Sequence, residues 1–433
     1  MIAQSMTEKS MATAFGLDKR ALTVAPVNGP LNGRVTPPGS KSITNRALLL
    51  AALAKGTSHL TGALKSVDTK LMAEALRAMG VTIDEPDDTS FIVASTGRLE
   101  APAAPLALGN AGTAMRFLTA AVTLVQGTVV VDGDAHMRKR PIGPLVEALR
   151  SIGIAASDAS GYPPVIVHGN GAFGSGRVEI DGGLSSQYVS ALLMAAAFGN
   201  GPIEVALTGS EIGARGYVDL TIAAMRAFGA SVEQIDATSW RVQPTGYTAT
   251  DYVIEPDASA ATYLWAAEVL SGGQIDLGVA SDAFTQPDAK ARAVIAQFPR
   301  LPAVIDGSQM QDAVPTIAVL AAFNETPVRF VGIANLRVKE CDRVAAVATE
   351  LSRIRPGLGT EEGDDLIVAS DPKLAGQLLP TRIETYSDHR IAMSFALAGL
   401  KIGGITILDP GCVAKTYPTY WEALKSLGVE LAE

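Results

Sequence analysis

Residues 71–84 read LMAEALRAMGVTID, an amphipathic helix that ends at a glycine and runs into a short strand. The pattern returns as PLVEALRSIGIAAS (144–157), LTIAAMRAFGASVE (220–233) and YWEALKSLGVELAE (420–433). Glycine is the residue that most readily takes the left-handed conformation at the end of a helix. We therefore predict a repeated unit of helix, glycine cap and strand.

The spacing of these glycines sets the number of units. Gly80, Gly153 and Gly229 are separated by roughly 73 and 76 residues, and the gap to Gly428 has room for about three more periods, two of them degenerate. Each unit mixes helices with short alternating strands, so we predict an α+β fold with mixed sheets rather than a doubly wound sheet. The helices expected at 184–198, 260–270 and 391–400 are apolar nearly all round and should be buried.

Turn signals divide the chain of 433 residues into two lobes. Glu255-Pro256 follows the third repeat directly, and we place a hinge there. We expect residues 1–20 to be an N-terminal extension, residues 37–254 to form one lobe, and residues 21–36 with 255–433 to form the other. Ligand sites form preferentially between such lobes, so we expect the active site in that cleft.

Composition excludes several classes of protein. A net charge of −9 argues against a sequence-independent nucleic-acid binder, which needs a basic surface. No apolar run approaches the roughly 20 residues that span a bilayer, and the first 20 residues lack the apolar core of a secretory signal, so we expect a soluble cytoplasmic protein. Two cysteines are too few for a disulfide framework, and no Cys/His spacing is typical of a metal site.

The segment PPGSKSITNR (37–46) predicts an anion site. A glycine turn delivers Lys41, Ser42 and Arg46 to the start of an apolar helix, where backbone N–H groups also favour negative charge. It is not a nucleotide-triphosphate P-loop, because Ser40 separates Gly39 from Lys41 and position 34 is Arg. The alternative is an ordinary capped helix with a surface lysine.

Five further segments place polar or charged groups at turns and helix starts. Three suit an anionic or sugar-like ligand: LGNAGTAMR (108–116), GDAHMRKRPIG (133–143) and LSSQY (184–188). Acids and bases concentrate in NLRVKECDR (335–343), and SDHR (387–390) directly precedes a buried helix, where unpaired charge is costly. Solvated basic loops, N-caps and salt-bridged faces are the alternative interpretations.

Together these segments resemble, in order, the 5-enolpyruvylshikimate-3-phosphate synthase family: PGSKSITNRALLLAALAKG, LGNAGTAMR, RPIGPLVEALR, LSSQY, NLRVKECDR, YSDHRIAMSFAL and DPGCVAKTYPTYWE. The resemblance implies two lobes, each of three βαβαββ units, that close over the substrates. It implies transfer of the carboxyvinyl group of phosphoenolpyruvate to the 5-hydroxyl of shikimate 3-phosphate, with release of phosphate through a tetrahedral adduct. It also implies no cofactor or metal, a monomer, and glyphosate as a possible inhibitor.

Carried over by position, the resemblance also assigns residues. It implies Asp312 as the base and Glu340 as the proton donor, assisted by Lys41, with Asp68 and His389 as secondary participants. The residues expected to bind shikimate 3-phosphate are Lys41, Ser42, Arg46, Ser185, Ser186, Gln187, Arg215, Tyr217, Asp312, Asn335 and Lys339. Those expected to bind phosphoenolpyruvate are Lys41, Gly112, Arg140, Gln187, Arg343, Arg390 and Lys415.

Three positions depart from the family pattern. Phe117 stands where the family often has Pro, which puts the response to glyphosate in question. Ala214 replaces a serine that helps to hold the phosphate, and Arg215 is expected to compensate. Cys341 replaces Thr or Ser, and we interpret it as structural.

Two alternative functions stay open. One is the related carboxyvinyl transfer to UDP-N-acetylglucosamine, although the loop 132–143 lacks the cysteine usual in that family. The other is a non-catalytic anion-binding protein built from the same repeats.

Overall fold

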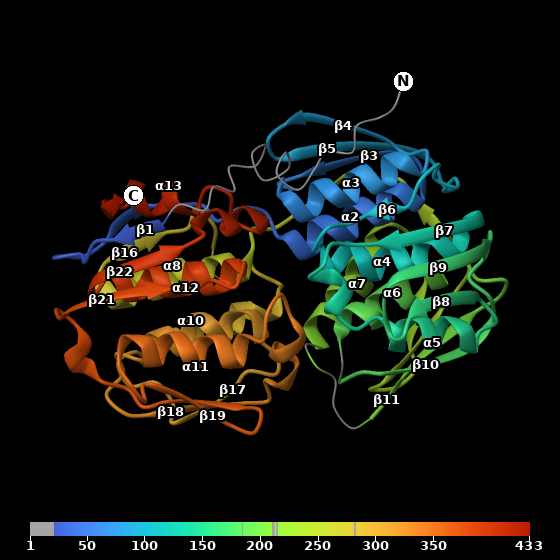
Figure 1. Ribbon diagram of the computed structural model, residues 1–433. Helices are drawn as coiled ribbons and strands as arrows, with labels where there is room; N and C mark the ends of the chain where they lie inside the picture. Colours follow the sequence, from blue (N-terminus) through green and yellow to red (C-terminus); the bar gives the residue numbers. More distant parts are fainter. Residues whose placement is uncertain (1–20, 184, 210–212, 214, 281–282) are drawn as a thin grey trace. The chain divides into compact units, whose positions relative to one another are not determined.

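The computed structural model describes residues 21–183, 185–209, 213, 215–280 and 283–433 (Figure 1). Its chain divides into two compact units. The 38–256 unit consists of Pro38–Pro256 and Thr285–Pro287. The 257–433 unit consists of Asp257–Phe284, Asp288–Glu433 and the N-terminal segment that ends at Pro37. A short stretch beyond the main crossover, Thr285–Pro287, thus belongs to the first unit.

The 38–256 unit contains six α-helices in its described residues, together with short strands. Its helices are α2 (Lys41–Leu53), α3 (Val67–Ala78), α4 (Gly112–Ala121), α5 (Gly143–Ser151), α6 (Ser186–Ala196) and α7 (Arg215–Ala227), with 3-10 turns η1 (Val122–Leu124) and η2 (Met137–Lys139). Its strands are β3 (Ala54–Thr61), β4 (Thr82–Asp87), β5 (Ser90–Thr96), β6 (Leu106–Ala107), β7 (Gln126–Asp132), β8 (Ala155–Ala159), β9 (Tyr162–Asn170), β10 (Gly176–Asp181), β11 (Ile203–Thr208), β12 (Val232–Gln234), β13 (Ser239–Val242), β14 (Tyr247–Thr248) and β15 (Tyr252–Val253).

The 257–433 unit has the same plan. Its helices are α8 (Ala258–Ser271), α9 (Ala291–Ile295), α10 (Val314–Ala321), α11 (Arg343–Ile354), α12 (His389–Gly399) and α13 (Tyr420–Ser426). Its strands are β1 (Ala21–Val24), β2 (Asn32–Arg34), β16 (Gln274–Asp276), β17 (Val304–Asp306), β18 (Val328–Val331), β19 (Gly359–Glu362), β20 (Asp365–Val368), β21 (Leu378–Ile383), β22 (Gly403–Leu408) and β23 (Leu431–Ala432). The 3-10 turns are η3 (Pro287–Lys290), η4 (Gln311–Ala313), η5 (Ala334–Val338), η6 (Pro372–Leu374) and η7 (Pro410–Lys415).

Five sheets share one strand order, in which a parallel pair is followed by two antiparallel neighbours. In the 38–256 unit these are β14-β3-β5-β4, with β15 also on β3, then β6-β7-β9-β8 and β10-β11-β13-β12. In the 257–433 unit they are β17-β18-β20-β19 and β21-β22-β1-β23, while the sixth sheet keeps only the parallel pair β16-β2. The predicted α+β fold of repeated βαβαββ units is confirmed, with one copy reduced.

The predicted glycine caps are also confirmed. Gly80, Gly153, Gly229 and Gly428 have φ between 85° and 89°, the left-handed region that side chains disfavour. Each glycine follows a helix (α3, α5, α7 and α13) and precedes a strand (β4, β8, β12 and β23). The helix–glycine–strand pattern in the sequence therefore reported the local backbone correctly.

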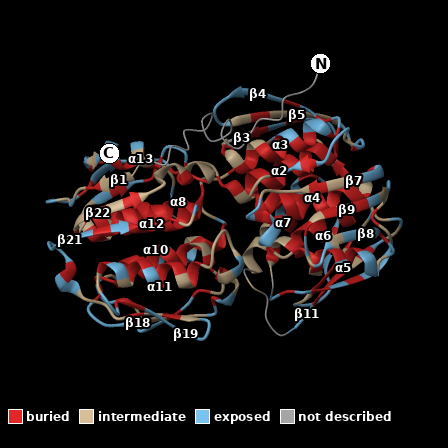
Figure 2. Cartoon of the chain, in the orientation of Figure 1, coloured by how far each residue is buried: buried red, intermediate tan, exposed pale blue. Residues whose placement is uncertain are grey.

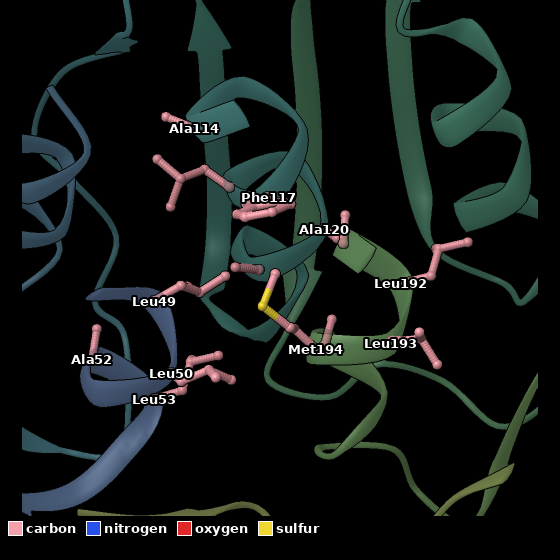
Figure 3. Close-up of a cluster of buried hydrophobic side chains, with 14 of the residues drawn as sticks. Leu49, Leu50, Ala52, Leu53, Ala114, Phe117, Ala120, Leu192, Leu193 and Met194 are labelled. Carbon is pink, nitrogen blue, oxygen red and sulfur yellow. The ribbon is translucent and has the colours of Figure 1, made fainter. Parts of the chain in front are cut away.

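Within each unit the core forms around helices that are buried on nearly every side. These are α2, α4 and α6 in one unit and α8, α10 and α12 in the other, as Figure 2 shows in red. Figure 3 shows side chains of the first core, contributed by α2 (Leu49, Leu53), α4 (Phe117) and α6 (Met194). Several motif residues lie at the N-terminal ends of these helices, among them Lys41 of α2, Gly112 of α4 and Arg390 of α12.

Candidate active site

The start of α2 is built around a glycine that no other residue can replace. A Cβ at Gly39 would lie 1.9 Å from the carbonyl oxygen of Gly62. Ser40 then caps the helix, since its Oγ accepts from the N–H of Ile43 at 3.4 Å. Lys41 follows, and its Nζ lies 3.3 Å from Oδ2 of the buried Asp68 on α3. The predicted anion site therefore has its lysine placed at a helix N-terminus beside a carboxylate.

Arg46 lies one turn further into α2 and is buried. Its Nε donates to Oγ1 of Thr221 at 2.7 Å, and its Nη2 donates to Oγ of Ser190 at 3.2 Å. Two backbone carbonyls, those of Ser42 and Tyr217, also accept from it. Burial lowers the pKa of Arg46 to about 10. The guanidinium thus ties α2 to α6 and α7, a framework role that the sequence did not indicate.

Phe117, the residue at the family's proline position, is fully buried in α4. Its ring lies under the guanidinium of Arg46, with 5.1 Å between Cζ and the ring centroid. A cation over an aromatic face is attracted by the ring quadrupole. Phe117 therefore supports Arg46 from below, and α4 runs as a continuous helix through this position.

Two arginines converge on Gly112, the first residue of α4. A Cβ at Gly112 would lie 2.7 Å from Nη2 of Arg140 and 2.8 Å from Nη1 of Arg116. Arg116 is fixed by the carbonyls of Gly112 and Pro141, at 3.1 Å each, and Arg140 donates to Oδ1 of Asn110 at 3.1 Å. Two cations beside a helix N-terminus favour an anion.

The start of α6 reaches the same helix end. Ser185 caps α6 by accepting from the N–H of Gln187 at 3.2 Å, and Ser186 is buried. The amide Nε2 of Gln187 donates to Oγ1 of Thr113 at 3.2 Å, which links the N-terminal ends of α6 and α4. Leu184 lies outside the described residues.

Arg215 and Tyr217 begin α7. The Arg215 guanidinium lies over the Trp240 ring at 5.0 Å and donates to Asp219 and to the carbonyl of Ala237. Tyr217 approaches Arg46 with its ring at 5.8 Å. Ala214, the predicted departure from the phosphate-binding serine, lies outside the described residues.

The 257–433 unit holds a second cluster, centred on the buried Arg343 at the start of α11. Arg343 donates to three carboxylates: Asp388 through Nε at 2.8 Å, Asp312 through Nη1 at 3.0 Å, and Glu340 through Nη2 at 2.7 Å. Arg390, at the start of α12, donates to the other oxygen of Asp312 at 2.7 Å. Asp312 is therefore held between two arginines.

Electrostatics keep both arginines charged. Burial opposes the charged form of Arg343, but Asp388, Glu340 and Asp312 outweigh it and raise its pKa above the usual value. Asp312 has the same effect on Arg390 and raises its pKa against the effect of burial. Arg390 also donates to the hydroxyl of Tyr263 at 3.4 Å, and burial raises the pKa of Tyr263 to about 12.

The remaining predicted residues of this unit come from η5, η7 and the start of α12. Asn335 is in η5 with its Oδ1 buried, Lys339 follows η5, and Lys415 ends η7, which packs on α12. His389 is buried at the start of α12, with Nδ1 at 3.6 Å from Oδ1 of Asp388. Burial raises the pKa of the Cys341 thiol, which donates to Asp388 at 3.5 Å, so Cys341 stays a thiol.

Three residues at these sites escaped the sequence-based assignment. Arg116 and Asp388 stand within the motifs that were singled out, but their roles depend on contacts with Pro141 and Arg343 that no local pattern encodes. Tyr263 comes from the middle of α8, a stretch whose sequence predicts a buried helix but contains no site motif.

No group of three His, Cys, Asp or Glu side chains in the described residues is arranged to hold a metal ion. No helix within the same residues is long and apolar enough to cross a membrane.

Comparison with known proteins identifies the relatives of this chain. The family model of EPSP synthase (3-phosphoshikimate 1-carboxyvinyltransferase) matches residues 27–424. A 3-phosphoshikimate 1-carboxyvinyltransferase of Rhizobium etli is 73% identical over 408 residues, which cover 94% of this chain and 97% of that protein. One of Pseudomonas savastanoi pv. phaseolicola is 70% identical over 410 residues, covering 95% and 98%.

Solved structures give the same picture for the fold. The EPSP synthase of Acinetobacter baumannii matches with a TM-score of 0.77 at 26% identity, covering 95% of this chain and 100% of that one. An enolpyruvyl transferase of Streptomyces tendae matches with a TM-score of 0.72 at 17% identity, covering 96% and 99%, and is similar in fold alone.

Proposed function

Because this chain belongs to the EPSP synthase (3-phosphoshikimate 1-carboxyvinyltransferase) family, we propose that it transfers a carboxyvinyl group from phosphoenolpyruvate to shikimate 3-phosphate. The acceptor is the 5-hydroxyl, and the products are 5-enolpyruvylshikimate 3-phosphate and inorganic phosphate. The match to the family extends over most of the chain, from residue 27 to residue 424, so the proposed reaction involves both units.

The observation that carries this proposal is the arrangement of two carboxylates on one buried arginine. Asp312 and Glu340 both accept from Arg343, at 3.0 and 2.7 Å, and Asp312 also accepts from Arg390. The reaction needs one group to remove a proton and another to supply one, beside cations that stabilise anionic substrates. This cluster contains all of these groups.

In the proposed first step, Asp312 takes the proton of the 5-hydroxyl as the oxygen attacks C2 of phosphoenolpyruvate. The C2=C3 electron pair takes a proton from Glu340, assisted by Lys41, which makes C3 a methyl group and gives the tetrahedral adduct. In the second step Asp312 gives its proton to the phosphate as the phosphate leaves C2, and Glu340 takes a proton from the methyl group to form the new C=C bond. The two carboxylates exchange roles between the steps, as general acid–base catalysis requires.

The cations explain how two anionic substrates are held near each other. Shikimate 3-phosphate is assigned to the ends of α2, α6 and α7, with Asp312, Asn335 and Lys339 from the other unit. Phosphoenolpyruvate is assigned to Lys41, Gly112, Arg140 and Gln187, with Arg343, Arg390 and Lys415. Fixed positive charge in a closed site offsets the repulsion between the substrates. That both units act on the same substrate pair is part of this proposal.

Glyphosate, a small anion, is proposed to compete with phosphoenolpyruvate at the Gly112 and Arg140 end of α4. Phe117 lies in α4, as Gly112 does, but its ring contacts Arg46 of α2, so its effect on glyphosate is proposed to be indirect. A cytoplasmic monomer is the proposed state, and this rests on family membership alone.

The test is phosphate release with phosphoenolpyruvate and either shikimate 3-phosphate or UDP-N-acetylglucosamine. We expect the wild-type protein to release phosphate with shikimate 3-phosphate as acceptor and not with UDP-N-acetylglucosamine. We expect Asp312→Asn and Lys41→Met to lose this release. The matched controls are Asp251→Asn and Lys55→Met, which change exposed side chains and should retain activity.

The other outcomes are equally informative. Release with the nucleotide sugar would move the protein to the related transferase. Absence of release with either acceptor would mean a binding protein without this activity. Full activity of Asp312→Asn would remove the base from the mechanism.

A further inference from the structure

The segment between β21 and α12 has an unusual backbone. Tyr386 and Ser387 are consecutive residues with φ of 55° and 54°, although neither is glycine. The left-handed region is disfavoured for residues with a side chain, and such residues persist only where their surroundings hold them there. They directly precede Asp388 and the proposed substrate ligand Arg390, so whatever holds them also sets the start of α12.

What holds them is a buried carboxylate on α11. The hydroxyl of Tyr386 donates to Oε1 of Glu350 at 2.7 Å, and the backbone N–H of Glu384 donates to Oε2 at 3.1 Å. Glu350 has no exposed surface (0%). One oxygen of Glu350 therefore accepts from a side chain of the segment, and the other accepts from its main chain.

Helix α11 makes a second set of hydrogen bonds to this segment. Arg343, two turns before Glu350 on α11, donates to both oxygens of Asp388, through Nε at 2.8 Å and Nη2 at 3.2 Å. Asp388 in turn caps α12 by accepting from the N–H of Arg390 at 2.8 Å. A continuous set of contacts thus runs from Glu350 through residues 384–388 to Arg390 and its bond with Asp312.

The charges around Glu350 fit a rigid anchor. Arg353 donates to Oε2 at 3.1 Å from the solvent side, where nearly half of the Arg353 side chain is exposed. Burial raises the pKa of the Tyr386 hydroxyl, and its bond to Glu350 raises it further, so the hydroxyl stays a donor at neutral pH. Glu350 and Tyr386 are connected to the carboxylates and arginines of the site through the segment 384–388 and through α11.

We propose that Glu350 and Tyr386 are positioning residues for the transfer reaction. By holding residues 384–388 against α11, they orient Asp388 and Arg390 so that the phosphoenolpyruvate-binding arginines are preorganised. This inference rests on the proposed function and adds two residues to it that do not touch substrate. Preorganised charges are effective because they need not reorient during the reaction.

The experiment uses the full-length protein and measures phosphate release with varied phosphoenolpyruvate at saturating shikimate 3-phosphate. The principal variant is Tyr386→Phe, which removes one hydroxyl. The matched control is Tyr247→Phe, since that hydroxyl also donates at 2.7 Å, to the carbonyl of Met194, but belongs to the 38–256 unit. The dissociation constant of shikimate 3-phosphate alone and the thermal midpoint are measured for each protein.

We expect kcat/KM for phosphoenolpyruvate to fall at least tenfold in Tyr386→Phe and less than twofold in Tyr247→Phe. The dissociation constant of shikimate 3-phosphate should stay within threefold of wild type in both. Glu350→Gln, which keeps one oxygen acceptor and the shape of the side chain, should lower kcat/KM for phosphoenolpyruvate at least threefold. It decides the matter if Tyr386→Phe does not fold.

Equal effects of the two tyrosine variants on kcat/KM would overturn the inference, because a purely structural hydroxyl explains them. A parallel loss of shikimate 3-phosphate affinity would also overturn it, because the effect would not be specific to the arginines. A wild-type protein that releases no phosphate would instead refute the proposed function itself, and that result is recognised without any variant.

Discussion

Gly112→Ala tests how closely the two arginines approach the start of α4. The added Cβ would lie 2.7 Å from Nη2 of Arg140 and 2.9 Å from its Cζ, with Nη1 of Arg116 at 2.8 Å on the other side. Carbon and nitrogen atoms pack comfortably only at about 3.5 Å, so each guanidinium must move away from the Cβ by about 0.7 Å or more. Arg116 is held by two carbonyls and Arg140 by an amide oxygen, so Arg140 is the side chain expected to move further.

The size of the effect follows from that displacement. A misplacement of about 1 Å at a substrate-positioning group costs on the order of 100-fold in rate, so we expect kcat/KM for phosphoenolpyruvate to fall about 10- to 100-fold. This corresponds to about 1.4 to 2.7 kcal/mol. Alanine is the better helix former, so the thermal midpoint should change little.

The assay is phosphate release with varied phosphoenolpyruvate, beside a thermal melt. Gly201→Ala is the matched control, because a Cβ at Gly201 would meet no atom within 4 Å and its φ is not positive. A Gly112→Ala protein whose kcat/KM stays within threefold of wild type would refute the reasoning that Gly112 spaces the arginines for substrate.

Three further predictions concern stability. Asp388→Asn weakens the fully buried bond to Arg343 and should destabilise the protein by about 3 kcal/mol in denaturant unfolding, whereas Asp364→Asn, at an exposed ion pair, should cost less than about 1 kcal/mol. Phe117→Ala leaves a cavity in the first core and should cost about 3 to 5 kcal/mol by the same measurement, and a cost under about 1 kcal/mol would contradict the packing described. Burial raises the pKa of Glu350, so the protonated side chain stabilises the fold at low pH and this contribution is lost as the pH rises above the ordinary pKa of a glutamate. Glu350→Gln does not titrate. The melting temperature of Glu350→Gln minus that of wild type should therefore be larger at pH 7 than at pH 4.

The repeated units could be predicted from sequence because their signal is local. A helix that ends at Gly80 or Gly153 requires only a left-handed residue followed by alternating apolar positions, and both lie within a few residues of each other. The buried helices were equally visible, since α12 is apolar on nearly every side.

Some short strands could not be predicted from local sequence, because they pair with segments that are distant in the chain. The first strand of the β14-β3-β5-β4 sheet is Tyr247–Thr248, which comes from the far end of the unit, and its pairing with Ala54 depends on contacts across nearly 200 residues. The reduced sheet β16-β2 shares this difficulty, because its strands have three residues each and carry little pattern.

The candidate site likewise has features that local sequence encodes and features that depend on contacts between distant segments. The motif at the start of α2 predicted Lys41 as a member of an anion site, because a helix N-terminus and a cation are encoded there together, whereas Gly112 and Arg343 were assigned through the resemblance to the family. The burial of Arg46 and its bonds to Ser190 and Thr221 escaped prediction, since they join three helices that are distant in sequence.

The pairing of β1 with β22 and β23 has a consequence for synthesis on the ribosome. Thr23 and Thr406 hydrogen-bond across that sheet although they are 383 positions apart. At about 5 to 20 residues per second, β1 waits about 20 to 80 s for its partners to be translated. The 38–256 unit is translated well before then, so β1, the first strand of the described residues to emerge, is among the last to be incorporated, with an open edge that nascent-chain chaperones have time to cover.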